Sequence, residues 1–148
     1  MKYVFFTFLF SISTLFLHAA AGIFDSFAIL NVNAGGNGFF DLGATTGNPD
    51  FEGTSIGFFD PSTQSLILGG QTKTFKNNGT DVTGASIFYR IYPLGAPSGT
   101  FTEIPYAFQI DNVGGTVGDQ QWGTDVNGAN ATDTGVEILS GTGLVAGD

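Results

Sequence analysis

The side chains that could carry out chemistry are few, and almost all of them are acidic. The chain has thirteen acidic residues, one histidine and no cysteine. Nucleophilic and acid–base catalysis usually needs a histidine, a cysteine or a tuned pair of carboxylates. The candidate acids lie in scattered loops, and no spacing singles out a pair among Asp50, Glu52, Glu103 and Asp111. We therefore expect no catalytic residue and predict that the chain is not an enzyme.

One loop is a candidate metal site. Zinc prefers histidine and cysteine, whereas calcium is bound by oxygen atoms. Asp125, Asn127 and Asp133 place three oxygen-bearing side chains within nine residues. The loop departs from the EF-hand pattern, because Gly128 is its fourth residue and Val136 its twelfth. A solvated polar loop is therefore the simpler interpretation, and calcium is the only cofactor that we consider.

The many aromatic residues raise the possibility of contact with a glycan. Trp122 is the best surface candidate, because the amide and carboxylate groups of Asp119, Gln120 and Gln121 beside it suit hydroxyl recognition. In a domain without cysteine, however, most aromatic rings must fill the core. Packing of Trp122 in the core or at its rim is therefore the favoured interpretation, and glycan contact is the alternative.

Arg90 lies within the apolar run Ala85–Pro93. Its stem can cover apolar surface while its head faces solvent, or it can pair with one of the many carboxylates. Ligand recognition is the less favoured alternative. The sequons at Asn78 and Asn130 matter only in a host that glycosylates such sites.

The N-terminus has the order of a secretory signal peptide. Lys2 precedes an apolar run, and small residues follow at positions 19–22. The apolar run of about fifteen residues is short for a membrane span, which needs about twenty. We predict cleavage after Ala20 or Ala21. Removal of residues 1–21 leaves a single domain of residues 22–148 that is secreted or on the cell surface and has no membrane contact.

The remaining domain is strongly acidic. Three basic residues, Lys73, Lys76 and Arg90, stand against thirteen acidic ones. Nucleic acid is an unsuitable partner, because phosphate binding depends on clustered lysine and arginine. The same acidic field repels an anionic membrane surface. Without a disulfide, the domain must be held together by its core or by bound ions.

Short β-prone runs alternate with turn residues along the chain. Ala85–Pro93 is the densest such run and is predicted to be the central strand, with Ile87, Tyr89 and Ile91 facing the core. Strands are also predicted at 24–33, 39–42, 57–59, 65–68, 72–75, 120–122 and 136–139. The runs 99–104 and 106–110 are either one strand interrupted by Pro105 or two strands joined at it. Strand spacings of about eight to twelve residues, without a convincing helix, favour an all-β antiparallel sandwich, Ig-like or jelly-roll-like.

Four segments resemble a recurring all-β module. They read LNVNAGG at 30–36, FDLGATTGNPDF at 40–51, YRIYPLGAPSG at 89–99 and DQQW at 119–122. The module occurs near the N-terminus of exported multidomain bacterial proteins and has no established activity, so it implies no catalytic residues here. In the module, a further strand follows the stretch that resembles 139–147. The resemblance therefore implies that the chain lacks one or more closing strands.

These features together predict a non-catalytic β-sandwich module of an exported or cell-surface multidomain protein. It would act in adhesion, spacing or glycan contact, with a glycan or a surface protein as its partner. The alternative is an accessory domain of an extracellular glycan-degrading enzyme whose catalytic part lies beyond residue 148.

Overall fold

The computed structural model describes residues 21–76, 81–92, 95–124 and 135–140. Its elements in chain order are β1 (Gly22–Val32), β2 (Asn37–Asp41), β3 (Leu66–Phe75), β4 (Ala85–Tyr89), β5 (Thr102–Asp111), the 3₁₀ helix η1 (Val113–Gly115), β6 (Gln120–Gly123) and β7 (Val136–Glu137). Every pair of named strands is antiparallel. The predicted all-β antiparallel fold is therefore confirmed.

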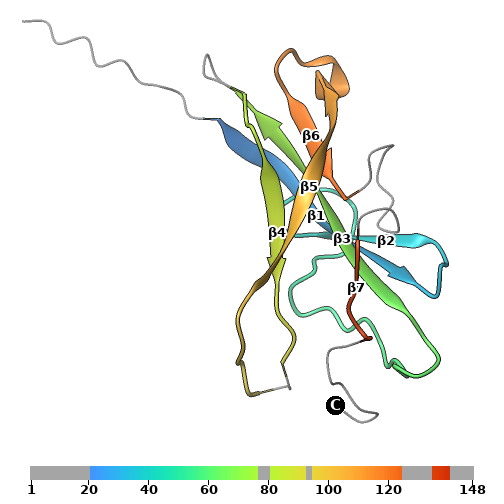
Figure 1. Cartoon of the computed structure of the whole chain (residues 1–148). Coiled ribbons are helices and arrows are strands. Elements are labelled where there is room, and N and C mark those ends of the chain that lie inside the picture. The colour runs from blue at the N-terminus through green and yellow to red at the C-terminus, as the bar shows by residue number, and fades with distance from the viewer. Residues whose placement is uncertain (1–20, 77–80, 93–94, 125–134, 141–148) are drawn as a thin grey trace, which may run out of the picture.

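The strands form one curled sheet (Figure 1) with the order β2-β1-β3-β6-β5-β4. β3 is its centre, since β1 runs along one side of it while β6 and β7 share the other. The curl brings the β4–β5 hairpin across β1 and β3 as a second layer. The molecule is thus a half-barrel with a sandwich-like interior.

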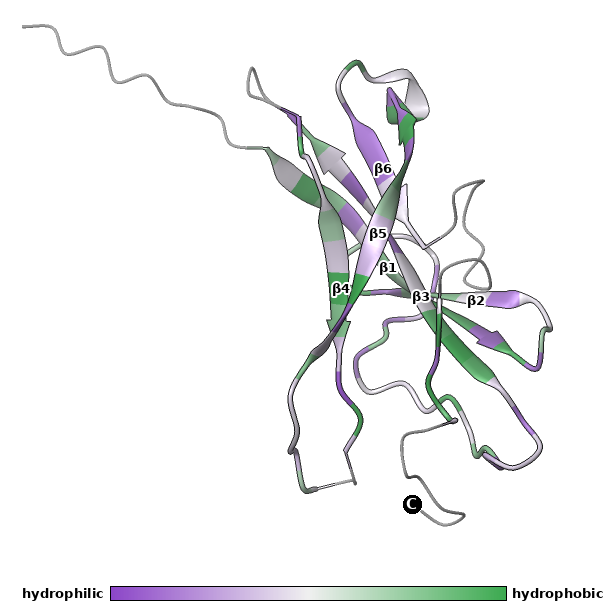
Figure 2. Ribbon diagram, viewed as in Figure 1, coloured by the Kyte–Doolittle hydropathy of each residue, from purple (hydrophilic) through white to green (hydrophobic). Residues whose placement is uncertain are grey.

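The hydrophobic core lies between these two layers. Its buried members come from β1, β3, β5 and the segment after β7, and they are Ala28, Leu30, Leu66, Leu68, Ile104 and Leu139. Ile87 and Tyr89 of β4 pack against this cluster from the opposite layer. Figure 2 shows a hydrophobic stretch in the first part of β3 and another in β4. Burying each large aliphatic side chain contributes about 1.5–3 kcal/mol, which makes this contact the main source of stability.

The prediction that Ala85–Pro93 is the central strand is wrong. Within the described residues, β4 pairs only with β5 and forms one edge of the sheet. The strand ends at Tyr89, so Ile91 lies beyond it and is 37% exposed, contrary to the predicted core position. Ile87 and Tyr89 do face the core. A dense β-prone run shows that a segment fits a pleated surface, but not that it has a neighbour on both sides.

The central strand of the sheet was predicted as two short strands. Residues 65–68 and 72–75 belong to one strand, β3, which continues through Gly69 and Gly70. A Cβ atom on Gly70 would lie 2.0 Å from the Tyr106 hydroxyl oxygen and 2.9 Å from the Phe27 carbonyl oxygen. Gly70 therefore permits a close approach of other chain segments and does not mark a turn.

Most other strand predictions agree with the structure. The runs at 24–33, 39–42, 120–122 and 136–139 correspond to β1, β2, β6 and β7. The two runs on either side of Pro105 are one strand, β5. Pro105 pairs with Ser86 of β4, whereas pairing with β6 begins at Ala107, so the missing N–H of Pro105 interrupts no bond to β6. Residues 57–59 form no strand.

Candidate functional site

The structure buries Trp122, the predicted centre of a glycan-binding surface. Its side chain is 7% exposed, and its ring meets Phe108 edge to face with 5.3 Å between centroids. Gln120 is also buried, and its side-chain oxygen accepts a hydrogen bond from the Val82 backbone N–H at 3.1 Å. Trp122 thus offers no open face for a sugar ring. The favoured sequence interpretation, a packing residue, describes its position.

The other two residues of that candidate surface also make local contacts. Gln121 donates from its side-chain amide to the side-chain oxygen of Gln109 at 2.8 Å. Asp119 is half-buried, and its backbone carbonyl accepts a hydrogen bond from the Val113 N–H. These contacts connect β6 with β5 and with η1. They explain the polar residues around Trp122 without a ligand.

The predicted calcium ligands Asp125, Asn127 and Asp133 lie outside the described residues. The calcium site therefore stays a prediction. Within the described ranges, no group of three or more histidine or acidic side chains could hold a metal ion.

Two of the four candidate acids accept local hydrogen bonds, Glu103 from the Ser86 hydroxyl and Asp111 from the Asn112 backbone N–H. Asp50 and Glu52 line an open groove together with Asp41, whose side chain is 5% exposed. The Asp41 carboxylate accepts hydrogen bonds from the backbone N–H and hydroxyl of Thr46 at 3.1 and 2.9 Å. This carboxylate fixes the loop after β2. Its burial was not visible in the sequence, where Asp41 looks like any other strand-end acid.

The described surface has a groove bordered by exposed aromatic side chains, which we call the aromatic groove. It has a volume of about 400 Å³ and lies between the end of β4, the core edge of β1 and β3, and the loop after β2. Three of its rings are strongly exposed: Phe88 at 58%, Tyr92 at 42% and Phe101 at 60%. Sequence reasoning missed this groove. Side-chain alternation placed Phe88 and Tyr92 only on the face of the predicted central strand that is opposite Ile87, Tyr89 and Ile91.

Strand pairing explains how the groove is assembled. Tyr89 pairs with Thr102 at the end of the β4–β5 ladder, so Arg90 and Phe101 are the first and last residues of the loop that joins the two strands. The guanidinium carbon of Arg90 lies 4.9 Å from the ring centroid of Phe101 and 5.0 Å from that of Tyr92. Both rings therefore make cation–π contacts with one arginine.

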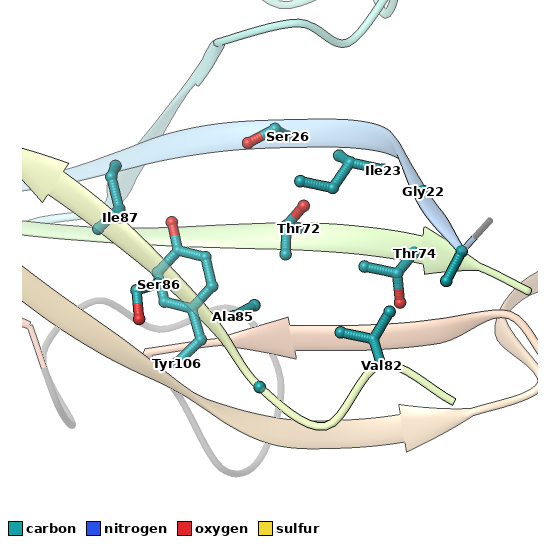
Figure 3. Close-up of a pocket in the computed structure, with 12 residues that line it drawn as sticks. Gly22, Ile23, Ser26, Thr72, Thr74, Val82, Ala85, Ser86, Ile87 and Tyr106 are labelled. Carbon is teal, nitrogen blue, oxygen red and sulfur yellow. The ribbon is translucent and has the colours of Figure 1, made fainter. Parts of the chain in front are cut away.

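A second cavity, of about 220 Å³, opens between the start of β1, the end of β3 and the start of β4 (Figure 3). Hydroxyl groups line much of it, from Ser26, Thr72, Thr74, Ser86 and Tyr106. Thr74 is 2% exposed, and its hydroxyl has no hydrogen-bond partner within the described residues. Burial raises the pKa of Tyr106, so its hydroxyl stays protonated near neutral pH. The cavity suits ordered water or a small neutral molecule, and its lining supplies no base for catalysis.

The fold and these sites define a class of protein: an all-β half-barrel with an aromatic surface groove and a small hydroxyl-lined cavity. No protein family, curated protein or solved structure matches the chain. No helix in the described part of the chain is long and apolar enough to cross a bilayer. The expected relation to modules of exported bacterial proteins stays a prediction.

Proposed function

We propose that this chain is a non-catalytic, extracellular recognition module that contacts a glycan through the aromatic groove. The observation that carries the proposal is the grouping of Phe88, Tyr92 and Phe101, all strongly exposed, around one groove. Aromatic rings suit the apolar faces of sugars, and grouped apolar side chains on a surface commonly mark interaction sites.

The scaffold is consistent with this role. Phe88 belongs to β4 and Phe101 directly precedes β5, and the pairing of these two strands sets the distance between the two rings. A site on paired strands loses less conformational freedom on binding than one on a long loop. The signal-like N-terminus supports an extracellular position, where a module of this kind would serve adhesion, spacing or glycan contact.

The role of an accessory domain in a glycan-degrading enzyme is the second candidate. It uses the same groove, because an accessory domain also holds a glycan without cleaving it. The two candidates differ in the segment that follows residue 148. A catalytic domain encoded there would favour the enzyme, and repeated β-modules would favour a surface protein.

Glycan contact is tested by calorimetric titration of the purified protein with a panel of neutral and acidic oligosaccharides. We expect binding to at least one of them. Phe88→Ala and Phe101→Ala should each weaken it about tenfold or more, as is usual for an aromatic side chain at the centre of an interface.

Val117→Ala is the matched control, because Val117 is 85% exposed and lies in the loop after η1, away from the groove. It should leave both affinity and thermal unfolding unchanged. The proposal is wrong if no oligosaccharide binds, or if Phe88→Ala and Phe101→Ala bind as tightly as the unsubstituted protein while remaining folded.

A further inference from the structure

We infer that the aromatic groove selects sugars that carry a carboxylate, and that Arg90 is the residue that binds this group. The inference rests on the proposed function and specifies its ligand class. It starts from the charges of the described residues, where Arg90 differs from both lysines.

Arg90 has no acidic partner in the part of the chain that the structure describes. Lys73 pairs with Asp25 at 3.0 Å, and Lys76 pairs with Asp81 at 2.5 Å. Arg90 forms no such ion pair with any acid of the described residues. Among the described residues, the single arginine of the chain thus has no counter-charge, and it lies beside the exposed rings of the groove.

The acid on the facing strand is engaged elsewhere. Glu103 pairs with Phe88 across the β4–β5 ladder, two residues from Phe101. Its carboxylate accepts a hydrogen bond from the Ser86 hydroxyl at 2.5 Å. Ser86 lies farther from the loop end of the hairpin than Phe88 does, so this bond directs the carboxylate away from Arg90.

Arg90 contacts two aromatic rings in place of an acid. Tyr92 and Phe101 lie at 5.0 and 4.9 Å from the guanidinium carbon. A guanidinium that rests on rings keeps N–H donors at its edge, and these form a planar fork that matches a carboxylate with two parallel hydrogen bonds. Because the rings already restrict the side chain, less rotamer freedom is lost when a ligand binds.

The surroundings make a carboxylated sugar a better match than a neutral one. A neutral sugar would stack on Phe88 and Phe101 but would leave the charge of Arg90 uncompensated. A uronic acid supplies both an apolar ring face and one carboxylate, and a groove of about 400 Å³ has room for one such ring. The net charge of −9 disfavours polyanions at long range, so selection must come from this short-range contact.

The test compares two forms of the same ligand. Oligogalacturonate and oligomannuronate are each titrated beside their methyl-esterified forms, which keep the sugar ring and lose the charge. We expect at least one acidic form to bind about tenfold or more tightly than its ester. Arg90→Gln should abolish that difference, and Arg90→Lys should restore it only in part, because lysine keeps the charge but lacks the planar fork.

Lys76→Gln is the charge-matched control, since it changes the net charge equally at a residue already paired with Asp81. It should preserve the preference for the acid. Equal losses in Arg90→Gln and Lys76→Gln would show a bulk charge effect and overturn the inference. Equal affinity for acid and ester would also overturn it while glycan contact stands. If no sugar of either kind binds, the proposed function fails as well.

Discussion

At the scale of single residues, exposure separates aromatic side chains that look alike in the sequence. Trp122 and Phe88 both lie in short β-prone runs, yet Trp122 is 7% exposed and Phe88 is 58% exposed. Trp122 belongs to β6, which lies between β3 and β5, whereas Phe88 belongs to the edge strand β4. The ring that seemed best suited to a glycan is therefore buried, and a phenylalanine borders the groove instead.

Gly70 is the residue for which the structure makes the sharpest stability prediction. Gly70→Ala places a methyl group 2.0 Å from the Tyr106 oxygen and 2.9 Å from the Phe27 oxygen. Relieving this overlap requires movement of packed layers, so we expect a loss of about 1–3 kcal/mol in chemical denaturation. Adding Tyr106→Phe should recover part of the loss, because it removes the nearest atom. Gly43→Ala, with no atom within 4 Å of its Cβ, is the control. Equal stability of Gly70→Ala and the unsubstituted protein would show that Tyr106 and Phe27 do not approach Gly70 closely.

At the scale of elements, β4 and β2 are the two ends of the strand order, and one side of β4 has no partner among the described strands. Unpaired edges expose backbone N–H and C=O groups that can pair with another molecule. The exposed ring of Phe88 lies on this strand and adds apolar surface beside the edge.

We expect the protein to self-associate reversibly through β4 as its concentration rises. Phe88→Lys should weaken this association, because a charged side chain on an edge opposes pairing between molecules. Its effect on stability should stay within about 0.5 kcal/mol, since Phe88 is largely exposed. Sedimentation velocity over a concentration series measures the association. Val117→Lys adds the same charge at a distant exposed site and should leave it unchanged. A strictly monomeric protein at millimolar concentration would contradict the role of the edge.

At the scale of the whole molecule, the two curled layers enclose Tyr106, and this gives stability a pH dependence. Burial raises the pKa of Tyr106 above its usual 10.0. In the unfolded chain the hydroxyl loses its proton near pH 10, while in the folded protein it keeps it. Above pH 10 the unfolded state therefore binds fewer protons, and the free energy of unfolding falls as pH rises.

We expect this fall to approach about 1.4 kcal/mol per pH unit from Tyr106 alone. Urea unfolding between pH 8 and pH 11 measures it, with Tyr106→Phe as the comparison. The variant lacks the titrating hydroxyl, so its stability should decline less steeply above pH 10, and the two proteins should run in parallel below it. Parallel curves over the entire range would show that Tyr106 is accessible to solvent in the folded protein.

The sequence alone determined the class of fold, because that class depends on local patterns. Alternating β-prone runs and turn residues predicted an all-β antiparallel domain, and the runs around β1, β2 and β6 were placed within a few residues. Such patterns reflect backbone geometry and side-chain alternation, which act over a few neighbouring residues. These patterns did not predict that β3 continues through Gly69 and Gly70. In a sequence, a glycine at a close contact between strands looks the same as a glycine in a turn.

Only the tertiary structure decided the order of the strands and, with it, the candidate site. Ala85–Tyr89 has the most strand-like composition but lies at an edge, and β3 is central because β1 pairs along one side of it and β6 and β7 along the other. Phe88 is exposed because β4 is an edge strand, and the loop that joins β4 to β5 brings Arg90 into contact with the rings of Tyr92 and Phe101. The exposure of a side chain and its pairing with an opposite charge depend on which distant segments of the chain become neighbours. Local sequence preferences do not determine those neighbours.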